Sequence, residues 1–311
     1  MMRRYASTII VLVVIFLIVF YLWNQRELVA TLRHITFTIV LLLILLRLAI
    51  MVLNGLFLYI FVEKFNVRLR VLEWFGLAAV TTMGNYITPL SGGLIARAAY
   101  LKHQHRLPYT KFTALLAANY IVMFWLIGFT GLLTLGWLDQ FTVDKWPIII
   151  LFGAVVVALS IFAVLPSFHF QSQQRWLQAI NSLGDGWQQI RSDRLLLAKI
   201  TICTILVIIV NGLSFWVGYR ALGITVTFSV GILLGLIAAF SIFINITPGS
   251  LGVQEAMISL SSELLGIGAG QGLLVVLLIR AASMVSAFTR GPIFTIWLTK
   301  QVQSVETSQQ N

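Results

Sequence analysis

Charged residues are scarce in this sequence, and their scarcity excludes a water-soluble domain of this length. Asp, Glu, Lys and Arg make up 10% of the 311 residues, whereas hydrophobic residues make up 59%. A soluble domain carries about 25% charged residues, because its surface has to be hydrated. The composition indicates an integral membrane protein. The net charge of +11 then belongs to loops beside anionic lipid headgroups and not to a nucleic-acid surface.

Cysteine and the signatures of soluble catalysis are also rare. The single cysteine, Cys203, lies in an apolar stretch, which excludes an intramolecular disulfide and favours a packing role. The four histidines lack the spacing of metal ligands, and there is no Gly-Lys-Ser/Thr phosphate loop and no nucleophile elbow. We therefore expect no metal, no cofactor and no enzymatic activity, and neither an ATP-driven pump nor a hydrolase.

Long apolar runs, by contrast, are abundant. A helix needs about 20 residues to cross roughly 30 Å of hydrocarbon, and lipid cannot hydrogen-bond an open backbone. The runs with enough apolar residues are 8–23, 35–61, 112–138, 147–165, 200–219 and 270–298. The sequence predicts an all-α protein with six spans. The first is expected to be retained, because "YLWNQRE" offers no small-residue cleavage site.

Basic residues indicate which loops face the cytoplasm. They gather at Arg3 and Arg4 and in the segments 64–70, 97–111 and 175–199, which the positive-inside rule places on the cytoplasmic side. The segments 64–70 and 97–111 cannot both be cytoplasmic if the run "WFGLAAVTTMGNYI" between them crosses once. Because this run is too short to span, we expect a re-entrant hairpin that enters and leaves on the cytoplasmic side.

The turn of this hairpin occurs twice. The segment "ITPLSGG" at 87–93 matches "ITPGSLG" at 246–252 in five of seven positions. Three predicted spans separate the copies, so a second hairpin would enter from the opposite face. We expect two inverted repeats, about 35–138 and 200–298, in one membrane domain of residues 1–302. The alternative is that each Pro-Gly segment only kinks an ordinary span.

Two polar segments complete the predicted organisation. Apolar residues at helical spacing within about 170–192 predict an amphipathic helix at the cytoplasmic interface. The segment 303–311 is polar, and we expect a disordered tail there.

The two turns predict where a ligand binds. Each Thr-Pro proline frees a backbone carbonyl, and the helix that restarts after the turn points its N–H groups at the tip, where they attract anions. Hydroxyl and amide side chains can satisfy the broken backbone or a ligand. The polar candidates are Asn85, Thr88, Ser91, Asn245, Thr247 and Ser250, and the turn residues are Pro89, Gly92, Gly93, Pro248, Gly249 and Gly252.

Four charged residues lie within or beside the apolar runs. Arg47 and Arg280 lie near the middle of predicted spans, while Arg97 and Glu255 follow the two turns. A charge at mid-membrane costs at least about 2.5 kcal/mol on insertion scales, so each needs a partner or a function. One interpretation is a structural ion pair of Glu255 with Arg280 or Arg47. The other is a role in substrate or ion passage, in which the excess arginine receives a phosphate; the two are compatible.

The segments "GNYITPLSGGLIARAAYL" and "NITPGSLGVQEAMISL" resemble the two signature segments of the lysylphosphatidylglycerol synthase transmembrane family, also called the flippase-like domain family. Residues 248–256 match its pattern Pro-Gly-x-Leu-Gly-x-x-Glu-Ala, and Gly93 and Arg97 match Gly-x-x-x-Arg. The resemblance covers nearly the whole chain. It implies a flippase or transporter of the prokaryotic inner membrane that moves an anionic or phosphate-bearing lipid headgroup, aminoacylated and polyprenyl-linked lipids included.

The resemblance has limits that leave other functions open. The soluble aminoacyltransferase domain of bifunctional members is not expected here, so synthase activity does not carry over. Leu94 and Gln254 stand where many members have an acidic and a basic residue, which leaves substrate class and proton coupling open. The alternatives are a membrane-embedded lipid-phosphate transferase and a non-catalytic partner subunit of a lipid or glycan synthase. Membrane lipids are the expected partners, with a homo-oligomer or a lipid-modifying enzyme as further ones.

Overall fold

The fold is helical throughout the part of the chain that can be described. The structure is a computed structural model that describes residues 12–16, 18–21, 23, 30–89, 91–137, 146–164, 174, 181, 184, 187–188, 191–244 and 247–310. Within these ranges every regular element is an α-helix or a 3-10 helix. This confirms the predicted all-α class.

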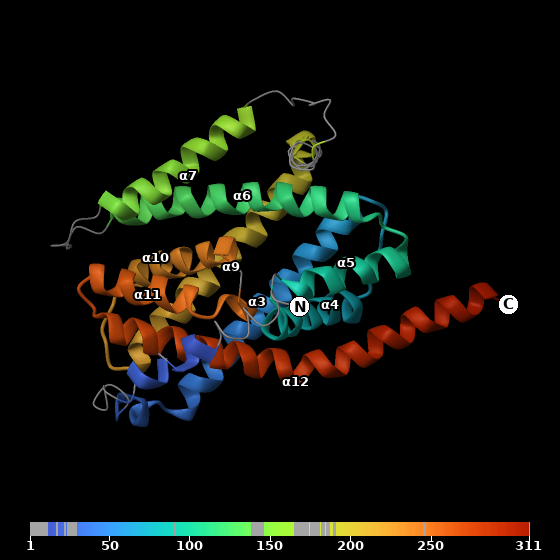
Figure 1. The fold of residues 1–311 in the computed structure, drawn as a ribbon. Helices are drawn as coiled ribbons and strands as arrows, with labels where there is room; N and C mark the ends of the chain where they lie inside the picture. The colour runs from blue at the N-terminus through green and yellow to red at the C-terminus, as the bar shows by residue number, and fades with distance from the viewer. Residues whose placement is uncertain are drawn as a thin grey trace.

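The elements follow one another as Figure 1 shows. The long helices are α3 (Phe37–Glu63), α6 (Tyr109–Gly136), α7 (Trp146–Val164), α9 (Arg194–Ala221) and α12 (Ala269–Gln310). The shorter helices are α4 (Val71–Ile87), α5 (Gly92–His105), α10 (Phe228–Ala239) and α11 (Val253–Leu264). Three 3-10 segments are η1 (Thr31–His34), η2 (Phe240–Ile244) and η3 (Pro248–Ser250).

Five helices are long and apolar enough to cross a membrane: α3, α6, α7, α9 and α12. They coincide with the five predicted runs from residue 35 onward, because hydrophobic length is a local property of the sequence. The first run, 8–23, is described only in part, as a shorter apolar helix between Leu12 and Tyr21. A sixth span therefore stays a prediction, and so does the amphipathic helix at 170–192, most of which lies outside the described residues.

Both Thr-Pro segments interrupt a helix instead of kinking it. The first separates α4 from α5, where Ser91 has a φ of 56°. The second separates α10 and η2 from α11, where Gly249 and Gly252 have φ of 60° and 90°. At about 1.5 Å per residue, α10 and α11 are each roughly 18 Å long, less than the hydrocarbon thickness of about 30 Å. The helices are therefore interrupted at both Thr-Pro segments, and a re-entrant course for the two pairs stays a prediction.

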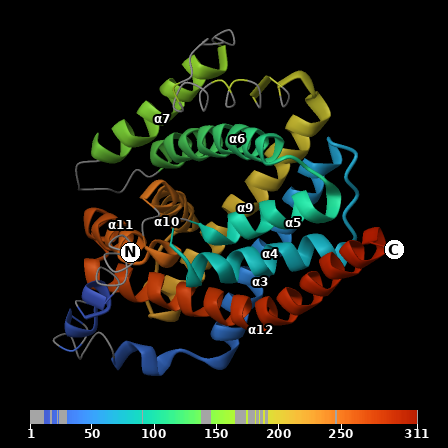
Figure 2. The same ribbon diagram turned by 45° about the vertical axis from the view of Figure 1, so that its right-hand side comes forward.

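The same order of elements occurs in both halves of the chain. A long helix, two shorter helices separated by a break, and another long helix appear as α3 to α6 and again as α9 to α12. Each pair of short helices packs on the last long helix of the other half, α4 on α12 and α10 on α6. In Figure 2, α5, α4 and α12 lie side by side.

Close glycine contacts set this packing. A Cβ atom at Gly84 would lie 2.8 Å from the Cα atom of Gly93, so α4 and α5 cross backbone to backbone. A Cβ atom at Gly212 of α9 would lie 2.7 Å from Ile232 of α10, and Gly55 of α3 meets Trp74 of α4 in the same way. Gly55 and Gly212 belong to two copies of Asn-Gly-Leu, at 54–56 and 211–213, which the sequence analysis did not detect.

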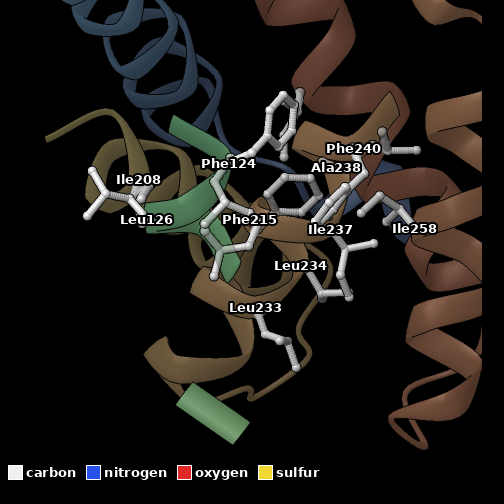
Figure 3. Close-up of a cluster of buried hydrophobic side chains, with 14 of the residues drawn as sticks. Phe124, Leu126, Ile208, Phe215, Leu233, Leu234, Ile237, Ala238, Phe240 and Ile258 are labelled. Carbon is white, nitrogen blue, oxygen red and sulfur yellow. The ribbon is translucent and has the colours of Figure 1, made fainter. Parts of the chain in front are cut away.

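The largest hydrophobic cluster joins the two halves. It contains Phe124 of α6, Phe215 of α9, Leu234 of α10 and Ile258 of α11, all labelled in Figure 3. Cys203 is a buried member of this cluster, which confirms its packing role. The core therefore holds the second pair of short helices against the first half of the chain.

The polar tail differs from its prediction. The chain from 303 onward is not disordered but forms the last turns of α12, which runs to Gln310. Pro292 lies inside this helix without ending it. No glycine or proline follows Pro292, and Gln, Glu and Leu are good helix formers, so a helix that is already nucleated continues into the polar segment.

Candidate functional site

The second break is held by a buried ion pair. Arg280 of α12 and Glu255 of α11 are 7% and 3% exposed, and Arg280 Nε lies 2.5 Å from Glu255 Oε1 without hydrogen-bond alignment. Arg280 Nη1 donates to the carbonyl of Gly249 at 2.8 Å, and Nη2 donates to Gln254 Oε1 at 3.2 Å. Glu255 Oε2 accepts the N–H of Gly252 at 2.7 Å. One guanidinium thus fastens α12 to the whole turn, and of the two partners considered for Glu255, Arg280 is the one observed.

The tip of the first break lies against this turn. The Arg280 guanidinium carbon is 6.0 Å from the ring centroid of Tyr86, the next-to-last residue of α4. A Cβ atom at Gly249 would lie 2.8 Å from Tyr86 Cδ1, and the positive φ of Gly249 is costly for any other residue. The two breaks therefore lie against each other, with Tyr86 of α4 in contact with the second turn.

Arg47 also lies near Tyr86. Its Nη2 donates to Asn211 Oδ1 at 3.1 Å, and Asn211 Nδ2 donates to the carbonyl of Gly235 at 2.9 Å. Tyr86 is within electrostatic range of Arg47. Arg47 and Arg280 are each roughly 15 Å from the nearer end of their helices, about half the hydrocarbon thickness. Arg47 joins α3 to α9 and α10 at mid-depth.

Arg97 lies apart from the other two arginines. It is 8% exposed, and its Nε donates to Thr81 Oγ1 at 2.9 Å. It lines a pocket of about 300 Å³ between α4, α5 and α12, together with Tyr100 and with Thr295 and Thr299 of α12. No contact joins Arg97 to Glu255 or Arg280 in the described part of the chain. Of the three arginines that the sequence offers for a phosphate, Arg97 therefore lies in a pocket of its own, apart from the contacts of Arg280.

The polar residues of the first turn satisfy the interrupted backbone. Asn85 Oδ1 accepts the N–H of Gly93 at 3.1 Å, and Thr88 Oγ1 donates to the carbonyl of Gly84 at 2.5 Å. Ser91 precedes α5 in a left-handed conformation. Of the two roles considered for these side chains, backbone satisfaction is the one that the structure displays.

The second turn uses its hydroxyls in the same way. Thr247 Oγ1 donates to the carbonyl of Leu251 at 2.7 Å, and Ser250 Oγ donates to the carbonyl of Ser241 at 3.2 Å. Thr247 is buried, and Asn245 lies outside the described residues. The proline of this turn, Pro248, begins η3, where its missing N–H leaves no donor unpaired.

The helix N-termini at the two tips do not present all their N–H groups to a ligand. Asn85 occupies the Gly93 N–H at the start of α5, and the Glu255 carboxylate occupies the Gly252 N–H before α11. A carboxylate at a helix N-terminus also repels an incoming anion. The predicted phosphate seat at the second tip is therefore filled by the protein's own acid.

A buried polar cluster near the start of α4 was missed. Glu73, 5% exposed, accepts hydrogen bonds from Tyr100 Oη at 2.9 Å and from the Arg70 N–H at 3.2 Å, and it lies 2.5 Å from His105 Nε2. Burial raises the pKa of Glu73, but the His105 and Tyr100 contacts outweigh it and lower this pKa. Tyr100 Oη also lies 3.0 Å from Gln301 Oε1. An acid three residues after a helix N-cap was the available sequence signal.

The geometry defines a multi-pass α-helical membrane protein with two broken helical segments that carry buried charges. The chain belongs to the family described as the lysylphosphatidylglycerol synthase TM region, whose family model matches residues 5–291. This confirms the resemblance drawn from the two Thr-Pro segments. Comparisons with curated proteins and with solved structures gave no match.

Proposed function

We propose that the protein is a lipid transporter, or flippase, that moves a phosphate-bearing lipid headgroup across a prokaryotic inner membrane. In this proposal the chain has six spans, and α4–α5 and α10–α11 are re-entrant hairpins in inverted repeats, with both termini in the cytoplasm. Membership of the family and the two interrupted segments support this arrangement. No catalytic step is assigned to the chain.

The observation that carries the proposal is the environment of Arg97. Its hydrogen bond to Thr81 uses Nε, which leaves Nη1 and Nη2 for the oxygens of a ligand. A planar guanidinium matches two phosphate oxygens, and the bond is strong where water is excluded. The walls of the pocket combine Thr81, Thr295 and Thr299 with apolar residues of α4 and α12. Such a pocket suits a headgroup whose acyl or prenyl chains stay in lipid.

The second break has a supporting role in the proposal. Glu255 neutralises Arg280, so the pair holds the turn without attracting a phosphate. Glu255 also lines a pocket of about 460 Å³ with Ser259 and Leu273. In this proposal Glu255 positions Arg280 or binds a coupling proton.

Reconstitution tests the proposal directly. The purified chain is inserted into liposomes that contain a trace of fluorescent phosphatidic acid or phosphatidylcholine, and dithionite is added outside to bleach accessible label. A transporter makes label in both leaflets accessible. Arg97→Gln is expected to slow translocation of the anionic lipid about tenfold or more, since charge-assisted hydrogen bonds are worth about 1.5–3 kcal/mol.

Arg290→Gln is the matched control. Arg290 is on α12, one wall of the Arg97 pocket, but its Nη1 donates to Ser286 and Thr289 of the same helix. This variant is expected to keep the wild-type rate. New lipid species in the liposomes would identify a transferase instead. If the wild-type protein translocates no lipid, a partner subunit would be favoured. Either result would contradict the proposal.

A further inference from the structure

A mostly apolar cavity with a few polar side chains lies away from both pockets described so far. It measures about 110 Å³ and is lined by residues of α3, α6, α9 and α10. Its polar side chains are Asn54, Asn119, Asn211 and Thr204, and none of the described residues that line it is charged. It adjoins the core cluster of Figure 3, because Ile208 belongs to both.

The cavity lies near the middle of long helices and between the two halves of the chain. Asn54, Asn119 and Asn211 are each between about 13 and 15 Å from the nearer end of their helices. Asn54 and Asn211 are the first residues of the two Asn-Gly-Leu copies, so each half contributes the corresponding asparagine. Hydrocarbon offers neither donor nor acceptor at this depth.

The amide groups differ in whether they already have partners. Asn211 uses both its oxygen and its nitrogen, toward Arg47 and Gly235, and Thr204 donates to its own helix. Asn119 is 8% exposed, and its Oδ1 is buried with no hydrogen-bond partner among the described residues. Asn54 is exposed. An unpaired amide in an apolar interior is costly, which indicates that something polar occupies the cavity.

The chemistry of the lining excludes a charged occupant. A bound cation would need several converging oxygens, but Asn211 Oδ1 is taken by the Arg47 guanidinium, whose charge repels a cation. An anion would find no charged residue among the described residues that line the cavity, and the guanidinium of Arg47 reaches the wall only through its hydrogen bond to Asn211. The side-chain amide of asparagine has a hydrogen-bond donor next to an acceptor. Two neighbouring hydroxyl groups can accept from the donor and donate to the acceptor.

We propose that this cavity binds the vicinal hydroxyl groups of a lipid headgroup, those of glycerol or of a sugar, as a station at mid-depth. The inference rests on the proposed transport function and narrows its substrate to hydroxyl-bearing headgroups. Asn119 and Asn54 hydrogen-bond the hydroxyls, and Arg47 fixes Asn211 on the opposite wall. The volume suits the task, since it equals that of about three to four water molecules at roughly 30 Å³ each.

A pair of lipids that differ only in hydroxyl groups tests this inference. The detergent-purified full chain is mixed with equal amounts of phosphatidylglycerol and phosphatidylpropanol of identical acyl chains, and native mass spectrometry measures which lipid stays bound. We expect phosphatidylglycerol to be retained about fivefold or more over phosphatidylpropanol, since one or two neutral hydrogen bonds distinguish them. A second comparison, glucosyl-diacylglycerol against diacylglycerol, separates a sugar from a glycerol headgroup.

Variants of the lining residues test whether the preference for phosphatidylglycerol arises in this cavity. Asn119→Leu has nearly the same shape and is expected to abolish the preference for hydroxyls. Asn54→Leu is expected to weaken it several-fold, and it remains informative if Asn119→Leu does not fold, because Asn54 is exposed and tolerates an apolar side chain in lipid. Asn66→Gly is the control: this asparagine lies in the turn after α3 with a φ of 59°, which glycine accepts.

The outcomes separate this inference from the function on which it rests. Equal retention of both phospholipids by the wild type would mean that water fills the cavity, and would overturn the inference while leaving the Arg97 pocket as the phosphate site. A preference that survives both Asn119→Leu and Asn54→Leu would overturn it too. Arg97→Gln should weaken the binding of both phospholipids equally, because they carry the same phosphate. If the wild type retains neither phospholipid, the proposed function itself fails.

Discussion

The two breaks in the helical chain each have one buried arginine beside them, but they hold it in different ways. Arg97, which follows the first break, has one hydrogen bond to a threonine and lines an open pocket. Arg280, which reaches the second break from α12, contacts Glu255, Gly249 and Gln254. A guanidinium that is already paired has few donors left for a ligand. The same break in the backbone is thus accompanied by one arginine that lines a pocket and by one that holds the turn.

The two arginines are paired differently because only the second turn is followed by an acidic residue, Glu255. Glu255 begins α11, where it caps the helix and meets α12 at once. The corresponding position after the first break is Ala96, so nothing neutralises Arg97 there. The flanks of the two matching segments therefore differ in charge at two positions, where Ala96 corresponds to Glu255 and Arg97 corresponds to Ala256. In the proposed function, the glutamate is what keeps a phosphate from the second break.

The largest expected effect concerns the buried ion pair. Arg280→Gln is expected to destabilise the protein by about 3–5 kcal/mol, because it leaves the Glu255 carboxylate buried without a charged partner. Thermal unfolding in detergent, followed by tryptophan fluorescence, measures the loss. The double variant Arg280→Gln/Glu255→Gln should recover most of the stability. A single variant as stable as the wild type would show that the pair does not hold the second turn.

The next effect concerns the meeting of the two tips. Gly249→Ala is expected to cost about 1–3 kcal/mol, since alanine is strained at a φ of 60° and its Cβ would collide with Tyr86. Gly136→Ala is the control, because no atom lies within 4 Å of a Cβ added there. The same unfolding experiment compares them. Equal stability of the two variants would contradict the close contact between the breaks.

A smaller stability effect is expected at the first break. Arg97→Gln should change the free energy of unfolding by about 1 kcal/mol or less, because the lost hydrogen bond to Thr81 is offset by the relief of a buried charge. Its main consequence is on lipid translocation. A loss as large as that of Arg280→Gln would mean that both arginines are structural, and the distinction between the breaks would disappear.

The smallest loss of stability is expected at an exposed ion pair, which serves as a reference for the buried one. Lys64 Nζ lies 2.6 Å from Asp193 Oδ2, as close as the buried pair, but both side chains are about one-third exposed. The hydrogen bond from Lys64 lowers the pKa of Asp193. Asp193→Asn is expected to cost no more than about 1 kcal/mol, since asparagine still caps α9 through the Leu196 N–H and water screens the lost charge. Unfolding at low and high salt checks this.

Much of the fold could be predicted because it depends on local properties. Five spans follow from apolar length, and both interruptions follow from proline and glycine within a few residues. The repeated Asn-Gly-Leu could also have been read from the sequence, but three residues at a distance carry little weight without the contacts of Gly55 and Gly212. The Glu73 cluster was harder to find, because its partners Tyr100, His105 and Gln301 come from two other helices.

The sequence by itself determined an all-helical membrane chain, the places where two helices break, and the charges that would lie in the apolar interior. These depend on hydrophobic length and on the backbone chemistry of proline and glycine, which act over a few residues. Only the tertiary structure decided that Glu255 pairs with Arg280, that Arg97 faces a separate pocket, and that three asparagines enclose a cavity. Those contacts join residues far apart in the chain, and they depend on which helices pack together.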